Sequence, residues 1–245
     1  MSRCRCHRDN DSGCLWTIVI FLLLLLIVRG GDRKHEAPRC RRSTDGGAPM
    51  STGKPLPLAE ARKCADLFRA HFVGMADRWI VAGSIRREKA EVGDIEHVVI
   101  PRFGEVVPPG GMFPERGNVL WNHLDQLVSI GGAFTKAVYG EGESFRWGER
   151  YRGVMFGGMK HEVFVADANN LGAILTIRTG PADLSRELVT ALRSRGYYHM
   201  HEGYVRSLGD GAIRPCPTEE AFFELCGIPV VPPERRRPLF TARAS

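Results

Sequence analysis

Two acidic side chains lie two positions apart at the start of an apolar run, and they are the side chains best suited to chemistry in this chain. They are Asp94 and Glu96, within VAGSIRREKAEVGDIEHVVI, Val81 to Ile100. This stretch predicts a strand, a Gly-Ser turn, a short basic helix and a second strand that opens with the acids. Because successive strand side chains point to opposite faces, both carboxylates share one face. Adjacent carboxylates repel unless a cation lies between them, and their hard oxygens suit Mg²⁺ or Mn²⁺.

The residues before the acids indicate phosphate binding. Gly83 and Ser84 form a turn whose backbone N–H groups no bulky side chain covers, which is a suitable nest for phosphate oxygens. Arg86 and Arg87 add positive charge a few residues later. A lone Asp-x-Glu is more often a solvated or ion-paired strand edge. The complete arrangement of phosphate nest, arginines and paired carboxylates favours phosphoryl or nucleotidyl transfer.

The motifs GSIRR and VGDIE resemble the palm signature of family X DNA polymerases, the polymerase-beta-like nucleotidyltransferases. The resemblance extends over roughly residues 55–235. It implies an α+β fold, in which a nucleotidyltransferase palm of mixed sheet and flanking helices is followed by a small C-terminal α/β, thumb-like subdomain. It also implies that Asp94 and Glu96 bridge two Mg²⁺ ions, with Mn²⁺ as an alternative, and that Gly93 lets the second strand begin close to the metals.

A third carboxylate stands near the start of the apolar strand KHEVFVA, Lys160 to Ala166. In family X palms the third metal ligand heads a strand of this kind, so the resemblance implies that Glu162 binds the metal that activates a primer 3′-OH. His161 points to the opposite face and is not expected to be a ligand. The family usually has Asp where this chain has Glu96 and Glu162. Glutamate has one methylene more than aspartate, so this difference bears on the catalytic rate and the metal preference more than on the type of reaction.

The nucleotide site is also predicted from the resemblance. Gly83, Ser84 and Arg87 are expected to hold the β and γ phosphates. The segment IRTGP, residues 177–181, resembles the family's aromatic-aromatic-Thr-Gly-Ser segment, which meets the sugar and base of the incoming nucleotide. Thr179 and Gly180 match this segment, whereas Ile177 and Arg178 replace the aromatic pair. We therefore expect Arg178, Thr179 and Gly180 at the nucleotide, without a prediction of which sugar is accepted.

The N-terminal region has two open interpretations. Leu15 to Val28 is an uncharged run of fourteen residues, LWTIVIFLLLLLIV, which is short for the ~30 Å hydrocarbon core. It is interpreted as a short membrane anchor, with basic residues after it that would keep the body in the cytoplasm. Alternatively, Met50 is the true start and residues 1–49 are an over-extended reading frame. In either case residues 29–49 are too polar to pack and are expected to be a disordered linker.

Charge is unevenly distributed along the chain. The net charge is +6, but residues 1–49 carry nine Lys and Arg against five Asp and Glu, and the remaining 25 basic and 23 acidic residues leave only +2 for the body. Net charge alone therefore does not argue for nucleic-acid binding.

The seven cysteines include no C-x-x-C pair. We expect reduced thiols and no zinc site.

We predict four regions along the chain. Residues 1–49 hold the hydrophobic segment and linker, 50–168 the palm, 169–235 the thumb-like subdomain and 236–245 a basic tail. In the subdomain, Thr218 is expected to cap a helix that ends at Gly227. The lyase domain and DNA-clamping hairpins of larger family members are not evident in the sequence, so the chain resembles a minimal form and is expected to be a monomer.

Three functional hypotheses remain at this stage. The first is transfer of a nucleotide from a nucleoside triphosphate to the 3′-OH of a DNA primer or primer-template, with template dependence undetermined. The second keeps the fold and changes the acceptor to a small molecule, an RNA end or a protein. The third is a membrane-tethered binding module with a decayed site, against which the three carboxylates argue.

Overall fold

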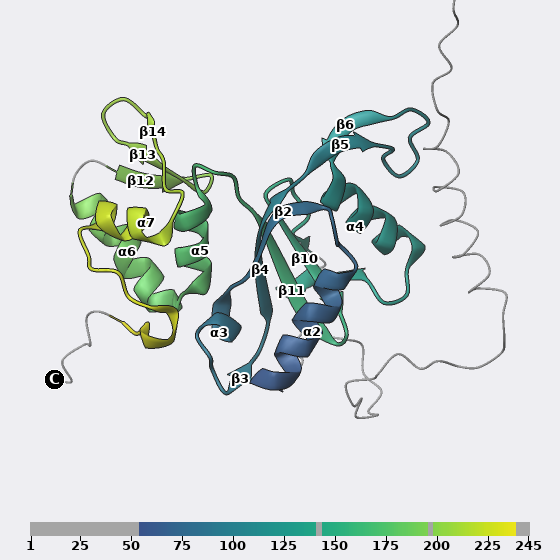
Figure 1. Cartoon of the computed structure of the whole chain (residues 1–245), viewed down its shortest axis with the longest axis horizontal. Helices are drawn as coiled ribbons and strands as arrows, with labels where there is room; N and C mark the ends of the chain where they lie inside the picture. The colour runs from purple at the N-terminus through teal and green to yellow at the C-terminus, as the bar shows by residue number, and fades with distance from the viewer. Residues whose placement is uncertain (1–53, 141–143, 196–197, 239–245) are drawn as a thin grey trace, which may run out of the picture. The chain divides into compact units, whose positions relative to one another are not determined.

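The computed structural model describes residues 54–140, 144–195 and 198–238. Over these ranges the chain is an α+β protein with a five-stranded mixed sheet and six α-helices, as Figure 1 shows. This confirms the predicted fold class at the level of secondary structure. The predicted anchor at 15–28 lies outside the described ranges, and within them no helix is long and apolar enough to cross a membrane. The predicted domain boundaries stay predictions.

The five-stranded sheet carries both acidic strands at its centre. Its strand order is β2-β4-β11-β10-β7. Strands β4 and β11 run parallel, and the other neighbouring pairs are antiparallel. The bounds are β2 Ala76–Val81, β4 Ile95–Pro101, β7 Thr135–Lys136, β10 Tyr151–Phe156 and β11 Met159–Val165. Because β10 and β11 form a hairpin, the chain returns to place β11 beside β4, as the resemblance implied.

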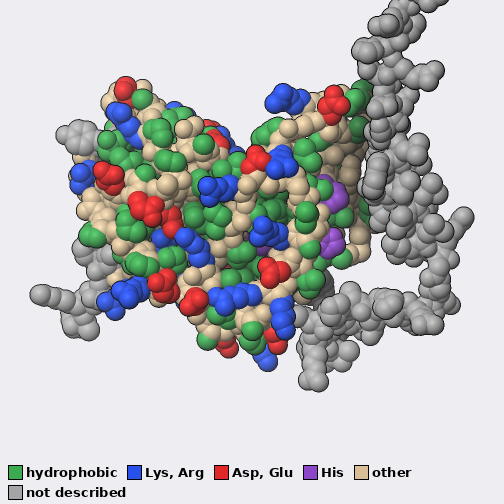
Figure 2. All heavy atoms as spheres, in the orientation of Figure 1, with side chains coloured by type: hydrophobic (Ala, Val, Ile, Leu, Met, Phe, Trp, Pro, Cys, Tyr) green, Lys and Arg blue, Asp and Glu red, His purple; other side chains and the backbone are tan. Residues whose placement is uncertain are grey.

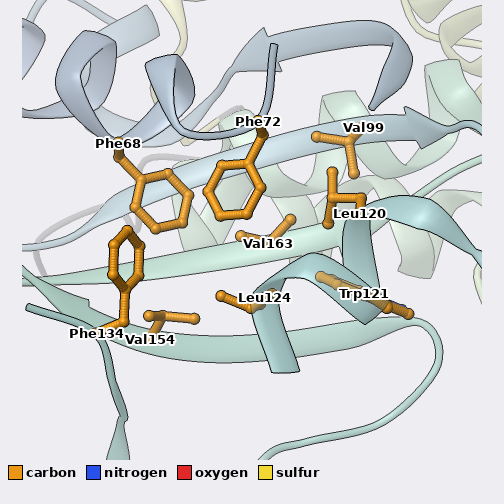
Figure 3. Close-up of a cluster of buried hydrophobic side chains, with 9 residues drawn as sticks. All are labelled: Phe68, Phe72, Val99, Leu120, Trp121, Leu124, Phe134, Val154 and Val163. Carbon is orange, nitrogen blue, oxygen red and sulfur yellow. The ribbon is translucent and has the colours of Figure 1, made fainter. Parts of the chain in front are cut away.

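Helices α2 (Leu58–Ala70) and α4 (Val119–Ile130) cover one face of the sheet (Figure 1). Apolar residues spaced from Leu58 to Phe72 predict a helical stripe, and Ala61, Ala65, Phe68 and Phe72 of this stripe are buried. Asn118 caps α4 by accepting a hydrogen bond from the Trp121 backbone N–H at 3.1 Å. Figure 3 shows side chains from both helices meeting those of the sheet. The buried cluster consists of Phe68, Phe72, Val99, Leu120, Trp121, Leu124, Phe134, Val154 and Val163. Burial of such side chains contributes ~1.5–3 kcal/mol each, so this cluster anchors the sheet.

The opposite face of the sheet carries the acids and packs against α5 (Leu171–Thr179). The buried residues here are Ala82, Val98, Phe164, Ala166, Leu171 and Leu175. The sequence pattern predicts a helix over Asn169 to Thr176, but α5 runs through Thr179 and ends at Gly180. Proline suits the first turn of a helix, and the sequence predicts Pro181 in that place, but it is the N-cap of α6 (Ala182–Ser194). Leu171, Ile174 and Leu175 of α5 pack against the sheet, whereas Ile177 packs against the C-terminal cluster, so both ends of the helix have tertiary contacts.

The C-terminal elements form a second buried cluster, around α5, α6 and α7 (Glu219–Cys226). A three-stranded sheet accompanies them, with β12 Tyr198–His201, β13 Tyr204–Ser207 and β14 Ile213–Arg214. The Glu202-Gly203 sequence predicts a turn, and the structure confirms it between β12 and β13, with positive φ at both residues. The Thr218 cap is also confirmed, since its hydroxyl accepts from the Ala221 N–H at 3.3 Å, and Gly227 ends α7 in the left-handed region.

Shorter elements complete the described chain. Helix α3 (Gly83–Arg86) fills the predicted place between the first two strands, but it begins at the glycine. The Pro-Pro-Gly-Gly sequence at residues 108–111 predicts only a loop, whereas strands β5 and β6 on either side of it pair as a hairpin. The remaining bounds are β1 Leu56–Pro57, β3 Glu91–Val92, β5 Phe103–Val106, β6 Glu115–Asn118, β8 Val138–Tyr139, β9 Ser144–Phe145 and the 3₁₀ turn η1 Pro233–Arg235.

Candidate active site

The structure brings the three predicted acidic residues to one region of the sheet. Glu162 is the direct register partner of Glu96 across the parallel β4–β11 pair. Partners in register point to the same face, so the two carboxylates lie side by side although they are far apart in the chain. Asp94 precedes the first residue of β4. The spatial grouping follows the prediction, and the roles of these residues in metal binding stay predictions.

Lys160 lies between two of the three acids. Its Nζ is 3.3 Å from Asp94 Oδ2 and 3.1 Å from Glu162 Oε1. Burial alone would lower the pKa of Lys160, but the two carboxylates outweigh it and raise that pKa above its ordinary value. The ammonium group therefore stays charged and offsets negative charge at the site. Sequence reasoning missed this residue, although the two-residue period of the strand places it on the same face as Glu162.

The surroundings of Glu96 disfavour the charged form of its carboxyl group. Burial, followed by the negative charges of Asp94 and Glu162, raises the pKa of Glu96 to about 8. The backbone of Gly83 lies directly against this carboxylate, since a Cβ at Gly83 would overlap Glu96 Oε2. Gly83 also has φ of +62°, so glycine is required both for space and for conformation.

Glu162 is held by partners from three strands. Its Oε1 lies 3.0 Å from the Tyr139 hydroxyl and 2.8 Å from the Tyr151 hydroxyl, in addition to the contact with Lys160. Burial raises the pKa of the Glu162 carboxyl, but Lys160 and the two tyrosine hydroxyls outweigh burial and hold that pKa below its ordinary value. Glu96 and Glu162 thus have pKa values shifted in opposite directions, an arrangement frequent at catalytic sites.

The two arginines of the GSIRR motif contact the C-terminal elements. Arg86 donates to both oxygens of Glu219 in α7, at 2.8 and 2.6 Å, and to the Thr179 hydroxyl at 2.9 Å. Arg236 donates to the same carboxylate at 2.8 Å. Sequence reasoning predicted neither Glu219 nor Arg236 as part of the site, because nothing local indicates contacts across so many residues.

Arg87, Thr179 and Gly180 are brought together as one group. The Arg87 guanidinium donates to the Thr179 carbonyl oxygen, and a Cβ at Gly180 would lie 3.0 Å from Arg87 Nη1. Burial lowers the pKa of Arg87, while Glu96 raises it in part. Thr179 is buried. The predicted phosphate-binding arginine and the predicted Thr-Gly pair are therefore neighbours.

Three residues of the predicted site remain to be placed: Arg178, Ser84 and Gly93. The Arg178 guanidinium lies over the Phe164 ring, 3.9 Å from its centroid, and lines a pocket between β10, β11 and α5. Ser84 lies half-buried within α3. A Cβ at Gly93 would meet open space, so packing does not require glycine there. The predicted reason for Gly93, close approach of the strand to metal, is not tested by these contacts.

A buried histidine pair lies behind the acids, on the opposite face of the same two strands. The Trp79 indole N–H donates to His97 Nδ1 at 3.1 Å, and His97 Nε2 lies 3.0 Å from His161 Nδ1. Burial lowers the pKa of both imidazoles, that of His161 to about 3. The expectation that His161 points away from Glu162 is confirmed, and its ring nitrogens contact His97 and the Cys64 sulfur instead.

The chemistry of the donor set fits a divalent cation. Three carboxylates supply hard oxygens on one face, and after burial it is the negative charges of Asp94 and Glu162 that raise the pKa of Glu96, which a cation would relieve. As the side chains stand, no three His, Cys, Asp or Glu residues in the described ranges are arranged to hold an ion. Metal binding would therefore require the Lys160 ammonium to withdraw from the carboxylates.

The charged side chains around this region are of mixed sign. On the face drawn in Figure 2, Lys and Arg side chains are interspersed with Asp and Glu over the sheet and the C-terminal elements. This agrees with the near-neutral charge of residues 50–245. Any contact with nucleic acid on this face therefore depends on individual side chains more than on a uniform basic surface.

Comparison with known proteins finds a family match for the C-terminal part of the chain. Residues 174–237 match the family model described as DNA polymerase beta thumb. The matched segment begins within α5 and contains α6, β12 to β14 and α7. No curated protein matches the chain. The match supports a relationship to the polymerase-beta-like, family X enzymes through the segment that supplies Thr179, Gly180 and Glu219.

Proposed function

We propose that this protein is a DNA polymerase-beta-like nucleotidyltransferase, which transfers a nucleotide from a nucleoside triphosphate to the 3′-OH of a DNA primer. The observation that carries the proposal is the register pair of Glu96 and Glu162. This pair lies on the sheet face against which α5 packs, and α5 enters the segment that matches a polymerase beta thumb. In this proposal the sheet is the palm, and the matched segment contributes to DNA binding.

Asp94, Glu96 and Glu162 would hold Mg²⁺, with Mn²⁺ as an alternative. Metal bound there supplies two effects: it lowers the pKa of the primer hydroxyl and it neutralises charge on the departing pyrophosphate. The protein contributes the positions of the carboxylates. Parallel pairing of β4 and β11 sets the spacing of Glu96 and Glu162, and the close approach of Gly83 restricts where the Glu96 carboxylate can lie.

The triphosphate would be held by Gly83, Ser84 and Arg87. Within the described ranges no side chain or backbone group bonds the Ser84 hydroxyl, so it can donate to a phosphate oxygen. Arg87 uses one N–H for the Thr179 carbonyl, and guanidinium has five N–H donors in all, so the others remain for phosphate. Positive charge fixed at this position stabilises the charge that develops on the leaving pyrophosphate.

An acceptor other than DNA is the second candidate. A nucleotidyltransferase core of this kind also serves enzymes that modify small molecules, RNA ends or proteins. The match of residues 174–237 to a polymerase thumb favours the DNA acceptor. Arg178 and Ile177 stand in place of the family's aromatic pair, so we make no proposal about the choice between deoxyribose and ribose.

The proposal is tested by primer extension with the full chain. A labelled primer is incubated with nucleoside triphosphates and Mg²⁺ or Mn²⁺, with and without a template. Extension is expected in the wild type and is expected to be lost in Asp94→Ala and in Glu162→Ala. Asp66→Ala, which removes an exposed carboxylate of α2, is the matched control and should retain activity.

The possible results separate the candidates. Template-directed extension that depends on Asp94 supports a polymerase, whereas extension without a template indicates a terminal transferase. An Asp94→Ala protein that extends primers as well as the wild type contradicts the proposed site. A folded wild type that binds nucleotide and metal but extends no primer favours the second candidate.

A further inference from the structure

Two tyrosine hydroxyls meet at the Glu162 carboxylate, and neither tyrosine belongs to the predicted site. Tyr151 Oη lies 2.8 Å and Tyr139 Oη 3.0 Å from Glu162 Oε1, and the two hydroxyl oxygens are 2.5 Å apart. Tyr139 is on β8 and Tyr151 is on β10. Side chains from β8 and β10 therefore converge on one carboxylate oxygen of β11.

The number of hydrogens defines how this group is bonded. Each tyrosine hydroxyl carries one hydrogen, and an ionised carboxylate only accepts. Three oxygen–oxygen contacts must therefore be satisfied by two hydrogens. One tyrosine donates to the other, and the second donates to Glu162. In either order Glu162 is the final acceptor of a two-hydroxyl chain, and each hydroxyl strengthens the donation of the other.

The opposite strand is shaped to admit Tyr139. Gly153 on β10 is the direct register partner of Glu162 on β11. A Cβ at Gly153 would overlap the Tyr139 hydroxyl oxygen and would lie 2.8 and 2.9 Å from two carbons of its ring. Gly153 is not among the residues with positive φ, so the backbone does not require glycine. The space above Gly153 is what allows the Tyr139 ring to lie across from Glu162.

The tyrosines and Lys160 all contact the same oxygen of Glu162. Lys160 Nζ is 3.1 Å from Oε1, and within the described ranges no group hydrogen-bonds Oε2. One oxygen is thus tied to the protein, while the other is available to a ligand. The Glu162 side chain is only 12 % exposed, so its orientation is set by these contacts more than by solvent.

Glutamate needs such a restraint more than aspartate does. Its extra methylene adds a rotatable bond, and ordering that bond costs side-chain entropy. A carboxylate that must face a metal or a reacting hydroxyl acts best when its rotamer is already set by neighbouring hydrogen bonds. The tyrosine pair supplies that restraint at the position where this chain has Glu.

We propose that Tyr139, Tyr151 and Gly153 form a positioning device for Glu162, named here the tyrosine clamp, which presents Oε2 of that carboxylate to the catalytic centre. The proposal rests on the proposed function, since it assigns Glu162 to the primer side of the reaction. The two tyrosines are positioning residues: they act through Glu162 and do not touch the substrate. Loss of the clamp should lower kcat and leave KM for the nucleotide nearly unchanged.

The test compares hydroxyl deletions in the full chain. Tyr139→Phe and Tyr151→Phe keep the rings and remove the donors, and Gly153→Ala displaces the Tyr139 ring. We expect each to lower kcat roughly 10–100-fold, as is usual when an outer partner of a metal-binding side chain is lost, with KM for the nucleotide within about twofold. Tyr204→Phe is the matched control, because Tyr204 also donates to a carboxylate, that of Asp167.

A binding measurement and a double-mutant cycle complete the test. Mn²⁺ is titrated against each protein without DNA or nucleotide and followed by electron paramagnetic resonance. Both tyrosine variants should bind Mn²⁺ about tenfold or more weakly than the wild type. In a Glu162→Asp background the shorter carboxylate no longer reaches the hydroxyls, so adding Tyr151→Phe should change neither Mn²⁺ affinity nor kcat further. A tyrosine that served only packing would weaken both backgrounds equally.

The outcomes separate the clamp from the proposed function. A wild type that extends primers, with both tyrosine variants within twofold of it in kcat and Mn²⁺ affinity, overturns the clamp and leaves the function standing. A wild type that binds Mn²⁺ but extends no primer, with Mn²⁺ binding weakened in both tyrosine variants, supports the clamp and refutes the polymerase. Absence of Mn²⁺ binding by the wild type overturns both. Since Tyr→Phe preserves the ring, the test does not depend on Gly153→Ala folding.

Discussion

Arg86 and Glu219 form a two-fold hydrogen-bonded ion pair, with distances of 2.8 and 2.6 Å, between the short helix that follows the first strand of the sheet and the first turn of α7. Arg236 donates to the same carboxylate, and its side chain is only 1 % exposed. One glutamate therefore pairs with two arginines that lie far apart in the chain. Such planar, two-fold pairs restrict orientation as well as contributing energy.

Glu219→Ala is expected to destabilise the fold by about 3–5 kcal/mol, because it leaves two largely buried guanidinium groups without their counter-charge. The measurement is urea unfolding at pH 7. Burial raises the pKa of Glu219, but Arg86 and Arg236 outweigh it and hold that pKa below its ordinary value. The ion pair therefore contributes stability above the unfolded pKa and loses it as the pH falls through the folded pKa.

The neighbouring exposed Glu220 provides the control for this prediction. Glu220→Ala removes the same charge from the first turn of α7 and should change stability by less than about 1 kcal/mol. Equal effects of the two substitutions would show that the contact with Arg86 contributes little.

Glu96→Gln is expected to make the protein more stable in alkaline solution while abolishing catalysis. The pKa of Glu96 is raised to about 8 in the fold, so the folded state holds a proton that the unfolded state has released. The stability this proton linkage contributes is complete below the unfolded pKa, near 4.5, and is lost as pH rises through about 8. The slope is at most about 1.4 kcal/mol per pH unit.

Thermal unfolding of the wild type and Glu96→Gln between pH 5 and 9 checks this prediction. The difference in melting temperature should grow in favour of the variant as the pH rises. Added Mg²⁺ should reduce the difference, since a divalent cation would favour the charged carboxylate. Parallel curves for the two proteins, with and without Mg²⁺, would contradict it.

Lys160→Met is expected to strengthen binding of divalent cations several-fold. The Lys160 ammonium contacts Asp94 and Glu162, so a cation competes with it for the same oxygens and is repelled by its charge. Mn²⁺ titration followed by electron paramagnetic resonance measures the change. Lys136→Met is the control, because the Lys136 ammonium lies over the Phe145 and Trp147 rings and not against a carboxylate. Weaker Mn²⁺ binding in Lys160→Met would refute the competition.

His97 and His161 are expected to remain neutral and to show a single tautomer each. The indole N–H of Trp79 can only donate, so His97 Nδ1 must accept, and His97 Nε2–H then donates to His161 Nδ1. A proton added to either accepting nitrogen would break this chain. Because the folded pKa values lie below the ordinary 6.5, the pair contributes stability above about pH 6.5 and loses it as the pH falls toward the folded pKa.

Nitrogen NMR of both rings between pH 5 and 8 checks the assignment. The shifts should indicate protonated Nε2 and unprotonated Nδ1 in each ring, with no titration in this range. Titration of either ring with a midpoint above 6 would show that the chain of hydrogen bonds is not formed as described.

Much of the candidate site was predictable from short stretches of sequence. The two-residue period of a strand places Asp94 and Glu96 on one face, and the same period separates Glu162 from His161. It would also have placed Lys160 beside Glu162, a consequence that sequence reasoning did not draw. Both the Thr218 cap and the Gly227 end of α7 are likewise local features, since each depends on backbone groups within a few residues.

The sequence by itself therefore determined which residues of each strand and helix share a face, because side-chain direction follows from local backbone geometry. Only the tertiary structure decided which faces meet. The Glu96–Glu162 pair depends on parallel pairing of β4 and β11, the tyrosine clamp on the space above Gly153, and the Glu219 ion pair on how the C-terminal elements pack. These contacts join residues far apart in the chain, and strand order and helix packing, which set them, leave no local signal in the sequence.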